Sequence, residues 1–239
     1  MPDKKLLLLS NGSELMGAEP TEFARSSVRD FLGAGIRRIL FVPFAAVIKS
    51  YDEYAERVRE RLCPLGFDIE SLHEAPDALA AVERAEAIAV GGGNTFHLLR
   101  GLYEAGVVEA IRARVEAGVP YVGWSAGSNV ACPTIMTTND MPVVEPPSFK
   151  ALNLVPFQIN PHYTDASLAG HHGETRDDRL REFVHANPGV RVVGLREGTM
   201  LRIEGASVAL LGGKSARIFT KGEEAADLAP EASFDFLLC

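Results

Sequence analysis

The chain has 239 residues, of which 46% are hydrophobic and 23% charged, as in an ordinary folded protein. A chain of this length buries roughly 70–75% of its unfolded surface, so its core needs no disulfide or metal. The net charge is −8, with 24 Lys and Arg against 32 Asp and Glu, and no basic run stands out. This argues against nucleic acid as a partner. We expect one domain over residues 1–239.

The start of the chain does not resemble a targeting segment. A charged lead is followed by only four leucines, Leu6–Leu9, whereas a signal peptide has a core of roughly 7–15 apolar residues. No run approaches the ~20 apolar residues of a membrane span. The three cysteines, Cys63, Cys132 and Cys239, lack the spacing of a disulfide framework or zinc site. We therefore expect a cytoplasmic protein with no membrane contact, metal or cofactor.

In the first half of the chain, short apolar runs alternate with amphipathic stretches, which is typical of βα units around a largely parallel sheet. The predicted strands are Lys5–Ser10, Arg38–Phe44, Phe67–His73, Glu86–Val90 and Pro120–Gly123. The predicted helices are Thr21–Leu32, Tyr51–Leu62, Asp77–Ala85, Phe96–Ala105 and Val107–Ala117.

The second half begins with an irregular, proline-rich segment, Thr137–Asn153, which predicts a long loop of the kind that is often functional. Further along, strands are predicted at Pro156–Asn160 and Val190–Leu195, with a helix at about Glu174–Ala186 between them. The last apolar segments alternate and are separated by glycines, which predicts antiparallel strands added at one edge of the sheet. They are Met200–Ile203, Val208–Leu211 and Ala216–Thr220.

The strongest chemical signal is the G-x-S-x-G pentapeptide Gly123–Gly127. It follows an apolar strand and precedes Ser128–Cys132, which can start a helix. A nucleophile elbow needs this strand–turn–helix setting, and the helix N-terminus would place positive charge beside a developing oxyanion. The alternative is a glycine-rich turn with an incidental serine. We predict that Ser125 is a nucleophile.

A serine nucleophile needs a base, and His162 is the best-placed histidine. It follows a predicted strand and so lies, like Ser125, at the carboxyl edge where open α/β sheets build their sites. The other histidines favour structural or surface roles, or, for the neighbouring pair, a loop without the carboxylates of a metal site. They are His73, His97, His185, His171 and His172.

Two carboxylates compete to orient this base. Glu197 follows the predicted strand Val190–Leu195, which places it at the same edge of the sheet. Asp140 lies in the irregular segment, fifteen positions after Ser125, and a loop returning from the elbow can bring it to the site. Strand position favours Glu197, but the sequence leaves both open.

A second glycine-rich motif, G-G-G-N at 91–94, follows another strand. It lacks the G-x-G-x-x-G spacing of a dinucleotide site and the lysine of a P-loop. Backbone N–H groups at Gly92 and Gly93 can instead complete an oxyanion hole with the amide of Ala126. The alternative is an ordinary tight turn.

Taken together, these motifs resemble the aspartyl dipeptidase (peptidase E) family. The resemblance spans almost the whole chain, in order. It rests on V-G-G-G-N-T-F at 90–96, G-W-S-A-G at 123–127, C-P-T-I-M-T-T-N-D-M-P at 132–142, Q-I-N-P-H at 158–162 and G-E-T-R at 173–176. Ser128, where the family has alanine, lies just after the elbow and is expected to matter little.

The resemblance implies a fold similar to class I glutamine amidotransferase domains. This is an α/β three-layer sandwich around a largely parallel sheet, here with antiparallel strands near the C-terminus. It also implies a cytoplasmic serine peptidase, monomeric or homodimeric, that cleaves dipeptides with an N-terminal aspartate. Ser125 would be the nucleophile and His162 the base, with Asp140 or Glu197 as third member. Arg176 matches the arginine that pairs with the substrate's aspartyl carboxylate, a task that suits a guanidinium.

Two other functions are compatible with the same residues. The chain can be a related peptidase that acts on another aspartyl compound, for example a cyanophycin-like polymer. It can also be a non-catalytic module that binds acidic small molecules, although a binder has no need for the nucleophile, base and acid.

Overall fold

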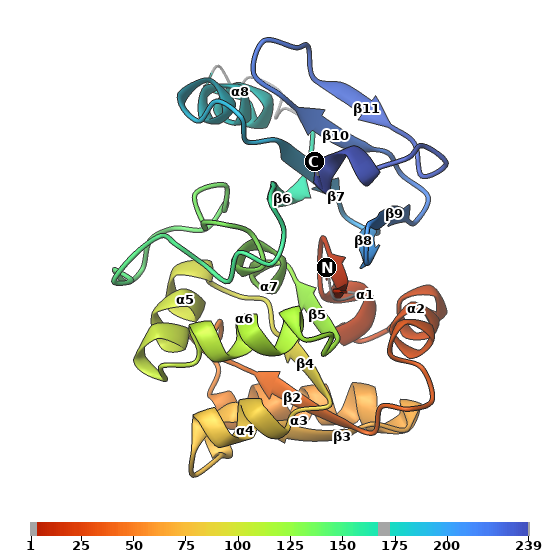
Figure 1. The fold of residues 1–239 in the computed structure, drawn as a ribbon, viewed down its shortest axis with the longest axis vertical. Coiled ribbons are helices and arrows are strands. Elements are labelled where there is room, and N and C mark those ends of the chain that lie inside the picture. The colour runs from red at the N-terminus through yellow and green to blue at the C-terminus, as the bar shows by residue number, and fades with distance from the viewer. Residues whose placement is uncertain (1–3, 167–172, 239) are drawn as a thin grey trace.

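The computed structural model describes residues 4–166 and 173–238; His171, His172 and Cys239 lie outside this range. A seven-stranded sheet forms the lower part of the molecule in Figure 1, in the order β3-β2-β4-β5-β1-β8-β9. The strands are β1 (Lys5–Leu9), β2 (Arg38–Val42), β3 (Asp68–Ser71), β4 (Ala87–Val90), β5 (Tyr121–Trp124), β8 (Met200–Glu204) and β9 (Ser207–Leu211). The first five are parallel, while β8 and β9 add antiparallel at the β1 edge.

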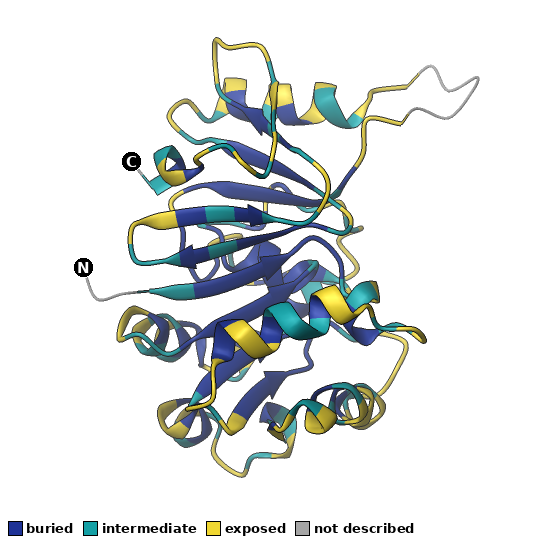
Figure 2. Cartoon of the chain, turned by 90° about the vertical axis from the view of Figure 1, so that its right-hand side faces the viewer, coloured by how far each residue is buried: buried dark blue, intermediate teal, exposed yellow. Residues whose placement is uncertain are grey.

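Helices cover both faces of this sheet. On one face lie α1 (Ser13–Met16), α2 (Glu22–Leu32) and α3 (Tyr51–Leu62), whose apolar residues pack with alternate residues of β1, β2, β4 and β5. On the other lie α4 (Ala78–Arg84), α5 (Thr95–Glu104), α6 (Val108–Glu116) and α7 (Ala126–Val130). In Figure 2 the strands are buried and the helices expose their outer sides. The predicted three-layer α/β fold is confirmed.

The element boundaries follow local chemistry. Thr21 caps α2, and Ser50 and Glu53 form a reciprocal capping box at α3, satisfying backbone N–H groups that a helix start leaves free. The described residues also contain three short 3₁₀ helices, at Cys63–Leu65, Leu72–Glu74 and Asp235–Leu238.

A second sheet of four strands lies at the top of Figure 1, in the order β11-β10-β7-β6. Its strands are β6 (Gln158–Tyr163), β7 (Val192–Arg196), β10 (Ala216–Phe219) and β11 (Ala226–Leu228). Only β6 and β7 are parallel. One face belongs to the same core cluster as the α4–α7 side of the main sheet. The other packs against α8 (Arg176–Ala186) through Leu180 and Val184.

The sequence predicted that all the C-terminal strands join one edge of a single sheet, and this prediction is wrong. β8 and β9 extend the main sheet, but β10 pairs with β7 in the second sheet. The chain changes sheet at the Gly212-Gly213 pair, which separates β9 from β10. Gly212 has φ +116° and no room for a side chain, since a Cβ there would lie 2.4 Å from the carbonyl oxygen of Gly198.

The segment Thr137–Asn153 contains no helix or strand, as predicted. It is nevertheless tied to the body of the molecule. Asn94 donates a hydrogen bond to the Met141 carbonyl at 2.8 Å, and Tyr103 donates one to the Lys150 carbonyl at 3.0 Å. Across the described residues, the helices are too short or too polar to span a lipid bilayer.

Candidate active site

Ser125 lies at the carboxyl end of β5, on the sharp turn that leads into α7. Its backbone has φ 54° and ψ −111°, a conformation that residues with side chains rarely adopt. The turn is held from both sides. The Ser125 N–H donates to the Leu9 carbonyl at 3.1 Å, and its carbonyl accepts from the N–H of Asn129 at 3.0 Å. This is the geometry predicted for a nucleophile elbow.

The glycines of the motif are required by close packing. A Cβ at Gly127 would lie 2.1 Å from the Val90 carbonyl oxygen, and one at Gly123 would lie 2.6 Å from the Gly127 carbonyl oxygen. Ser128 is buried, and its hydroxyl donates to the Leu9 carbonyl at 2.7 Å. The hydroxyl at position 128 thus links the elbow helix to β1.

His162 lies near the end of β6, where the pairing with β7 shifts register. Its φ is 53°, so it too has a left-handed backbone conformation. The His162 N–H donates to the Ser10 hydroxyl at 3.0 Å, and that hydroxyl donates to the Leu195 carbonyl at 2.7 Å. The buried Ser10 therefore joins the end of β1 to β6 and β7. The role of Ser10 was not predicted, because the sequence pattern places it as the last residue of the strand Lys5–Ser10, whereas β1 ends at Leu9.

The side chains of Ser125, His162 and Glu197 form a continuous chain of hydrogen bonds. The Ser125 hydroxyl lies 2.8 Å from Nε2 of His162, and Nδ1 lies 2.6 Å from Oε1 of Glu197. The two outer side chains come from different sheets. His162 and Glu197 are open to solvent, with 40% and 56% of their side-chain surface exposed, so a bound substrate can reach them. A base that faces a hydroxyl and is oriented by a carboxylate can activate the hydroxyl for attack.

Asp140 lies elsewhere in the site. Its carboxylate accepts hydrogen bonds from the N–H of Thr95 at 2.7 Å, the Thr95 hydroxyl at 2.6 Å and the Thr138 hydroxyl at 3.2 Å. Thr95 is the first residue of α5, so the negative charge lies at the positive end of that helix. Of the two carboxylates left open by the sequence, the structure brings Glu197 and not Asp140 to His162.

The glycine-rich turn after β4 lies directly beside the elbow. A Cβ at Gly92 would come within 3.0 Å of the Ser125 Cβ and of the Trp124 carbonyl oxygen. A Cβ at Gly93 would lie 2.2 Å from the Ala45 carbonyl oxygen. The backbone at Gly92 therefore approaches the serine more closely than a residue with a side chain could, while Gly93 packs against the backbone of Ala45. Ala126 follows the serine and begins α7.

Arg176 begins α8, where Thr175 and Asp178 form a capping box. Its Nη1 donates a hydrogen bond to Oδ1 of Asn160 at 3.1 Å, and Asn160 lies two positions before His162 on β6. Burial lowers the pKa of this guanidinium, which is half-buried and makes no ion pair within residues 4–166 and 173–238. A half-buried cation of this kind is suited to an anionic ligand.

A cavity of about 710 Å³ opens at Ser125 on the α1 and α3 side of the main sheet. Of the predicted site residues, Ser125, His162, Gly92 and Gly93 line it; Arg176, Asp140, Ala126 and Glu197 do not. Its floor includes Trp124 and Tyr54. The Trp124 indole donates to the Tyr54 hydroxyl at 3.0 Å, which donates to the Gly92 carbonyl at 3.0 Å. Burial raises the pKa of Tyr54 to about 12, so this hydroxyl stays protonated and neutral.

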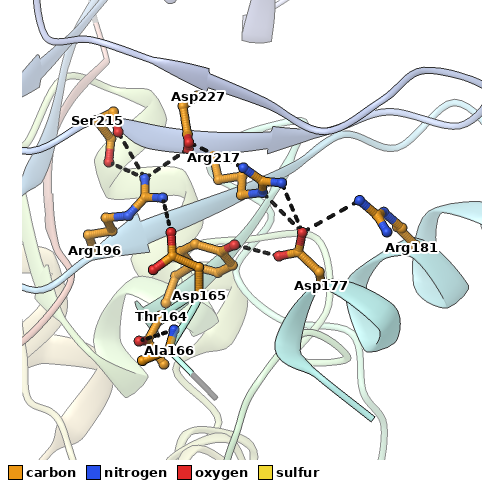
Figure 3. Close-up of polar contacts among 10 residues, drawn as sticks. Thr164, Asp165, Ala166, Asp177, Arg181, Arg196, Ser215, Arg217 and Asp227 are labelled. Atoms are coloured by element: carbon orange, nitrogen blue, oxygen red, sulfur yellow. Dashed lines mark hydrogen bonds and ion pairs between the residues drawn. The ribbon is translucent and has the colours of Figure 1, made fainter.

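A network of ion pairs links β7, β10 and β11 of the second sheet to α8 and to Asp165 (Figure 3). The Arg196 guanidinium pairs with Asp165 at 3.0 Å and with Asp227 at 3.0 Å. Arg217 pairs with Asp177 at 3.0 Å, and Asp177 accepts a hydrogen bond from Tyr163. Arg196 directly precedes Glu197 in the chain. Its two ion pairs link Asp165, three residues after His162, to Asp227 of β11. No local sequence pattern indicates this network, because its members are far apart along the chain.

The predicted structural histidines have local partners. His97 Nδ1 lies 2.7 Å from the Phe44 carbonyl oxygen, and His73 lies between Ser71 and Asp52. Asp52, His73 and Glu74 could together hold a metal ion by distance. Each already has a protein partner, however, since Glu74 pairs with Arg59.

Comparison with known proteins agrees with the site geometry, since the similar proteins are peptidases. The model of peptidase family S51 matches residues 6–211. Peptidase E from Nostoc sp. is 50% identical over 235 residues, covering 98% of this chain and 97% of that protein. A protein from Drosophila melanogaster named probable alpha-aspartyl dipeptidase is 50% identical over 241 residues, covering 100% and 99%. Peptidase E from Streptomyces coelicolor is 49% identical, covering 98% and 94%.

Solved structures resemble the fold. A putative peptidase E from Listeria monocytogenes has a TM-score of 0.64 at 22% identity, covering 88% of this chain and 98% of that one. A peptidase from an acI-B1 actinobacterium has a TM-score of 0.69 at 19% identity, covering 97% and 96%.

A serine on a strained strand–helix turn, hydrogen-bonded to a histidine that a carboxylate orients, defines a serine hydrolase on an α/β fold. Sequence similarity to peptidases over the full chain indicates that this hydrolase acts on peptide bonds. The chain belongs to peptidase family S51 and is a serine peptidase.

Proposed function

We propose that this peptidase hydrolyses dipeptides that begin with aspartate, through an acyl-enzyme on Ser125. The observation that carries the proposal is the hydrogen-bonded series Ser125–His162–Glu197, with the half-buried Arg176 attached to the same strand as the histidine. The coarser activity, that of a dipeptidase of family S51, rests on relatives at about 50% identity over the full chain. The aspartate preference draws on the name of the Drosophila relative.

In this mechanism His162 transfers one proton during acylation and another during deacylation. Nε2 takes the proton of the Ser125 hydroxyl as the oxygen attacks the scissile carbonyl, and then delivers it to the leaving amine. Water, activated by the same nitrogen, releases aspartate from the ester and restores the hydroxyl. Glu197 stabilises the imidazolium and holds Nδ1 protonated, since it lies 2.6 Å from that nitrogen.

The oxyanion is stabilised by backbone N–H groups. In this proposal the donors are the amide of Ala126, the first residue of the elbow helix, and those of Gly92 and Gly93; support comes from the close approach of Gly92 to Ser125, where a Cβ would lie 3.0 Å from the serine Cβ. Donors fixed before the reaction stabilise the developing charge without reorganisation, and loss of one typically costs about 10²–10³-fold in turnover.

Glu197 is the third catalytic group in this proposal, and Asp140 has a supporting role. Only the former contacts His162, while the latter binds Thr95 at the start of α5. By fixing α5, Asp140 also fixes the preceding turn, which contains Gly92 and Gly93.

Aspartate selectivity is assigned to Arg176. Its guanidinium can form two charge-assisted hydrogen bonds with a carboxylate. A neutral first residue would leave this half-buried cation without an anionic partner, which disfavours its binding.

The first test is release of free aspartate from Asp-Leu by the unaltered protein and by Ser125→Ala. We expect turnover in the former and a loss of at least about 10⁴-fold in the latter, because the covalent step is removed. Turnover that survives the substitution would refute the acyl-enzyme. The absence of turnover by the unaltered protein would refute the proposal that dipeptides beginning with aspartate are the substrate.

The second test concerns Arg176 and compares Asp-Leu with Asn-Leu, which is uncharged at the first side chain. We expect Arg176→Gln to lower kcat/KM for Asp-Leu by about 10²-fold and to reduce the preference for Asp over Asn. Arg179→Gln, on the exposed side of the same helix, is the matched control. An unchanged preference in Arg176→Gln would refute the assignment.

A further inference from the structure

The cavity at Ser125 carries two cations that the proposed mechanism does not use. Lys49 lies in the loop after β2 and Arg57 on α3, and both side chains are exposed at the cavity. Neither forms an ion pair or hydrogen bond with any residue of the described ranges 4–166 and 173–238. In a chain of net charge −8, two unpaired cations beside a nucleophile are unexpected.

Among residues 4–166 and 173–238, no carboxylate lines this cavity to neutralise them. The Tyr54 phenol, which also lines the cavity and interacts with the charge of Arg57, stays protonated because burial raises its pKa to about 12. The described part of the cavity therefore has a net positive charge, which favours an anionic ligand.

The rest of the lining is largely apolar. Two of the apolar residues that line the cavity are buried, Trp124 and Met16. Three others are exposed to solvent: Val47, Ile48 and Val143. Ile48 has its whole side chain in contact with solvent. A ligand that covers these residues would remove apolar surface from water, so the cavity suits a group that joins an apolar side chain to an anion.

We propose that this cavity binds the second residue of the dipeptide, with Lys49 and Arg57 binding its free α-carboxylate. The inference rests on the proposed function. His162 must reach the leaving amine to protonate it, and His162 lines this cavity, so the leaving residue is placed here. Arg176, which is assigned the aspartyl carboxylate, does not line it. The two negative charges of an Asp-Xaa dipeptide thus meet separate cations.

This arrangement gives the enzyme a way to recognise the end of its substrate. A dipeptide offers its carboxylate at the cavity, whereas an amide at the same position is neutral. Loss of a charge-assisted contact of this kind costs roughly tenfold in binding. The exposed apolar mouth also predicts that leucine or phenylalanine as second residue is cleaved better than glycine.

The test compares Asp-Leu with Asp-leucinamide, which differ only in the terminal charge. We measure kcat/KM for both substrates with the unaltered protein, Lys49→Ala, Arg57→Ala and the double variant. We expect the unaltered protein to prefer the free carboxylate by roughly tenfold, mostly through KM, and the double variant to bring the ratio close to one. Arg29→Ala removes an exposed cation of α2 that does not line the cavity, and should keep the original ratio.

The outcomes separate the two proposals. If the unaltered protein fails to release aspartate from Asp-Leu, the proposed function falls and this inference falls with it. If Asp-Leu is cleaved but the amide is cleaved equally well, or the ratio survives in the double variant, only the carboxylate site is refuted. If the double variant instead loses the preference for Asp-Leu over Asn-Leu, the two cations bind the aspartyl side chain and the assignment is wrong.

Discussion

Asp140 and Glu197 belong to two turns that border the same site but are built for different purposes. Asp140 has its carboxylate surrounded by donors from Thr95 and Thr138, and it anchors a long loop to the start of α5. Glu197 lies on the short connection where the chain passes from β7 of the second sheet to β8 of the main sheet. Its carboxylate points to His162 and is more than half exposed.

The difference shows how partners, and not residue type, decide what a carboxylate does. A group that accepts several hydrogen bonds from its own chain is committed to holding that chain in place. A group that faces one imidazole and solvent contributes little to stability, because exposed ion pairs are worth little. The first should therefore be sensitive in stability measurements, and the second in kinetics.

Among the substitutions that test this comparison, the largest effect on turnover is expected for Glu197→Gln. The amide cannot stabilise an imidazolium as a carboxylate does, and can favour the wrong tautomer of His162. We expect kcat for Asp-Leu to fall by about 10²–10⁴-fold. The melting temperature should change little, since an exposed substitution is usually worth less than about 0.5 kcal/mol. Steady-state kinetics and thermal melting of the same preparation check both statements.

Asp140→Asn should give the opposite profile. The amide keeps one acceptor but loses the charge at the N-terminus of α5, so we expect about 1–2 kcal/mol of destabilisation. Urea denaturation measures this. Turnover should fall by less than about tenfold, through loosening of the turn at Gly92 and Gly93. If this variant lost kcat more severely than Glu197→Gln, the roles of the two carboxylates would have to be exchanged.

The first half of the fold was predictable because its signals are local. Tyr51–Leu62 was predicted with the boundaries of α3 from its helical spacing and from Pro64 and Gly66 after it. The central strands were recognisable as apolar runs because both of their faces are buried. The second sheet was not recognised as separate, because the pairing of β10 with β7 joins segments that are distant in sequence.

The site divides in the same way. Ser125 and His162 could be found because each lies at or near the carboxyl end of a strand. The single sheet edge predicted for them is wrong, since their side-chain hydrogen bond joins β5 of the main sheet to β6 of the second sheet. The choice between Asp140 and Glu197 depends on how the second sheet packs against the first, which no local pattern reports. Lys49 and Arg57 were missed for a related reason, since a loop and the middle of a helix bring them to the cavity.

Thr138→Val sharpens the account of the Asp140 turn with a smaller effect. The Thr138 hydroxyl lies 3.2 Å from the Asp140 carboxylate and 3.0 Å from the Thr95 hydroxyl. Its loss should cost about 1 kcal/mol of stability. Because the two residues share one network, the double variant with Asp140→Asn should lose less than the sum of the single losses. Strict additivity in urea denaturation would mean that the two side chains act independently.

The smallest effect on turnover is expected at Lys214, whose ammonium contacts the backbone of Glu197, the carboxylate proposed to be catalytic. Its ammonium donates to the backbone carbonyl of Glu197 at 2.9 Å and is exposed, so its charge is screened by water. Lys214→Met should therefore lower kcat by less than about threefold, with Lys221→Met as an exposed control. A loss of tenfold or more would show that the turn after β7 needs this contact, and that Glu197 depends on its own chain as Asp140 does.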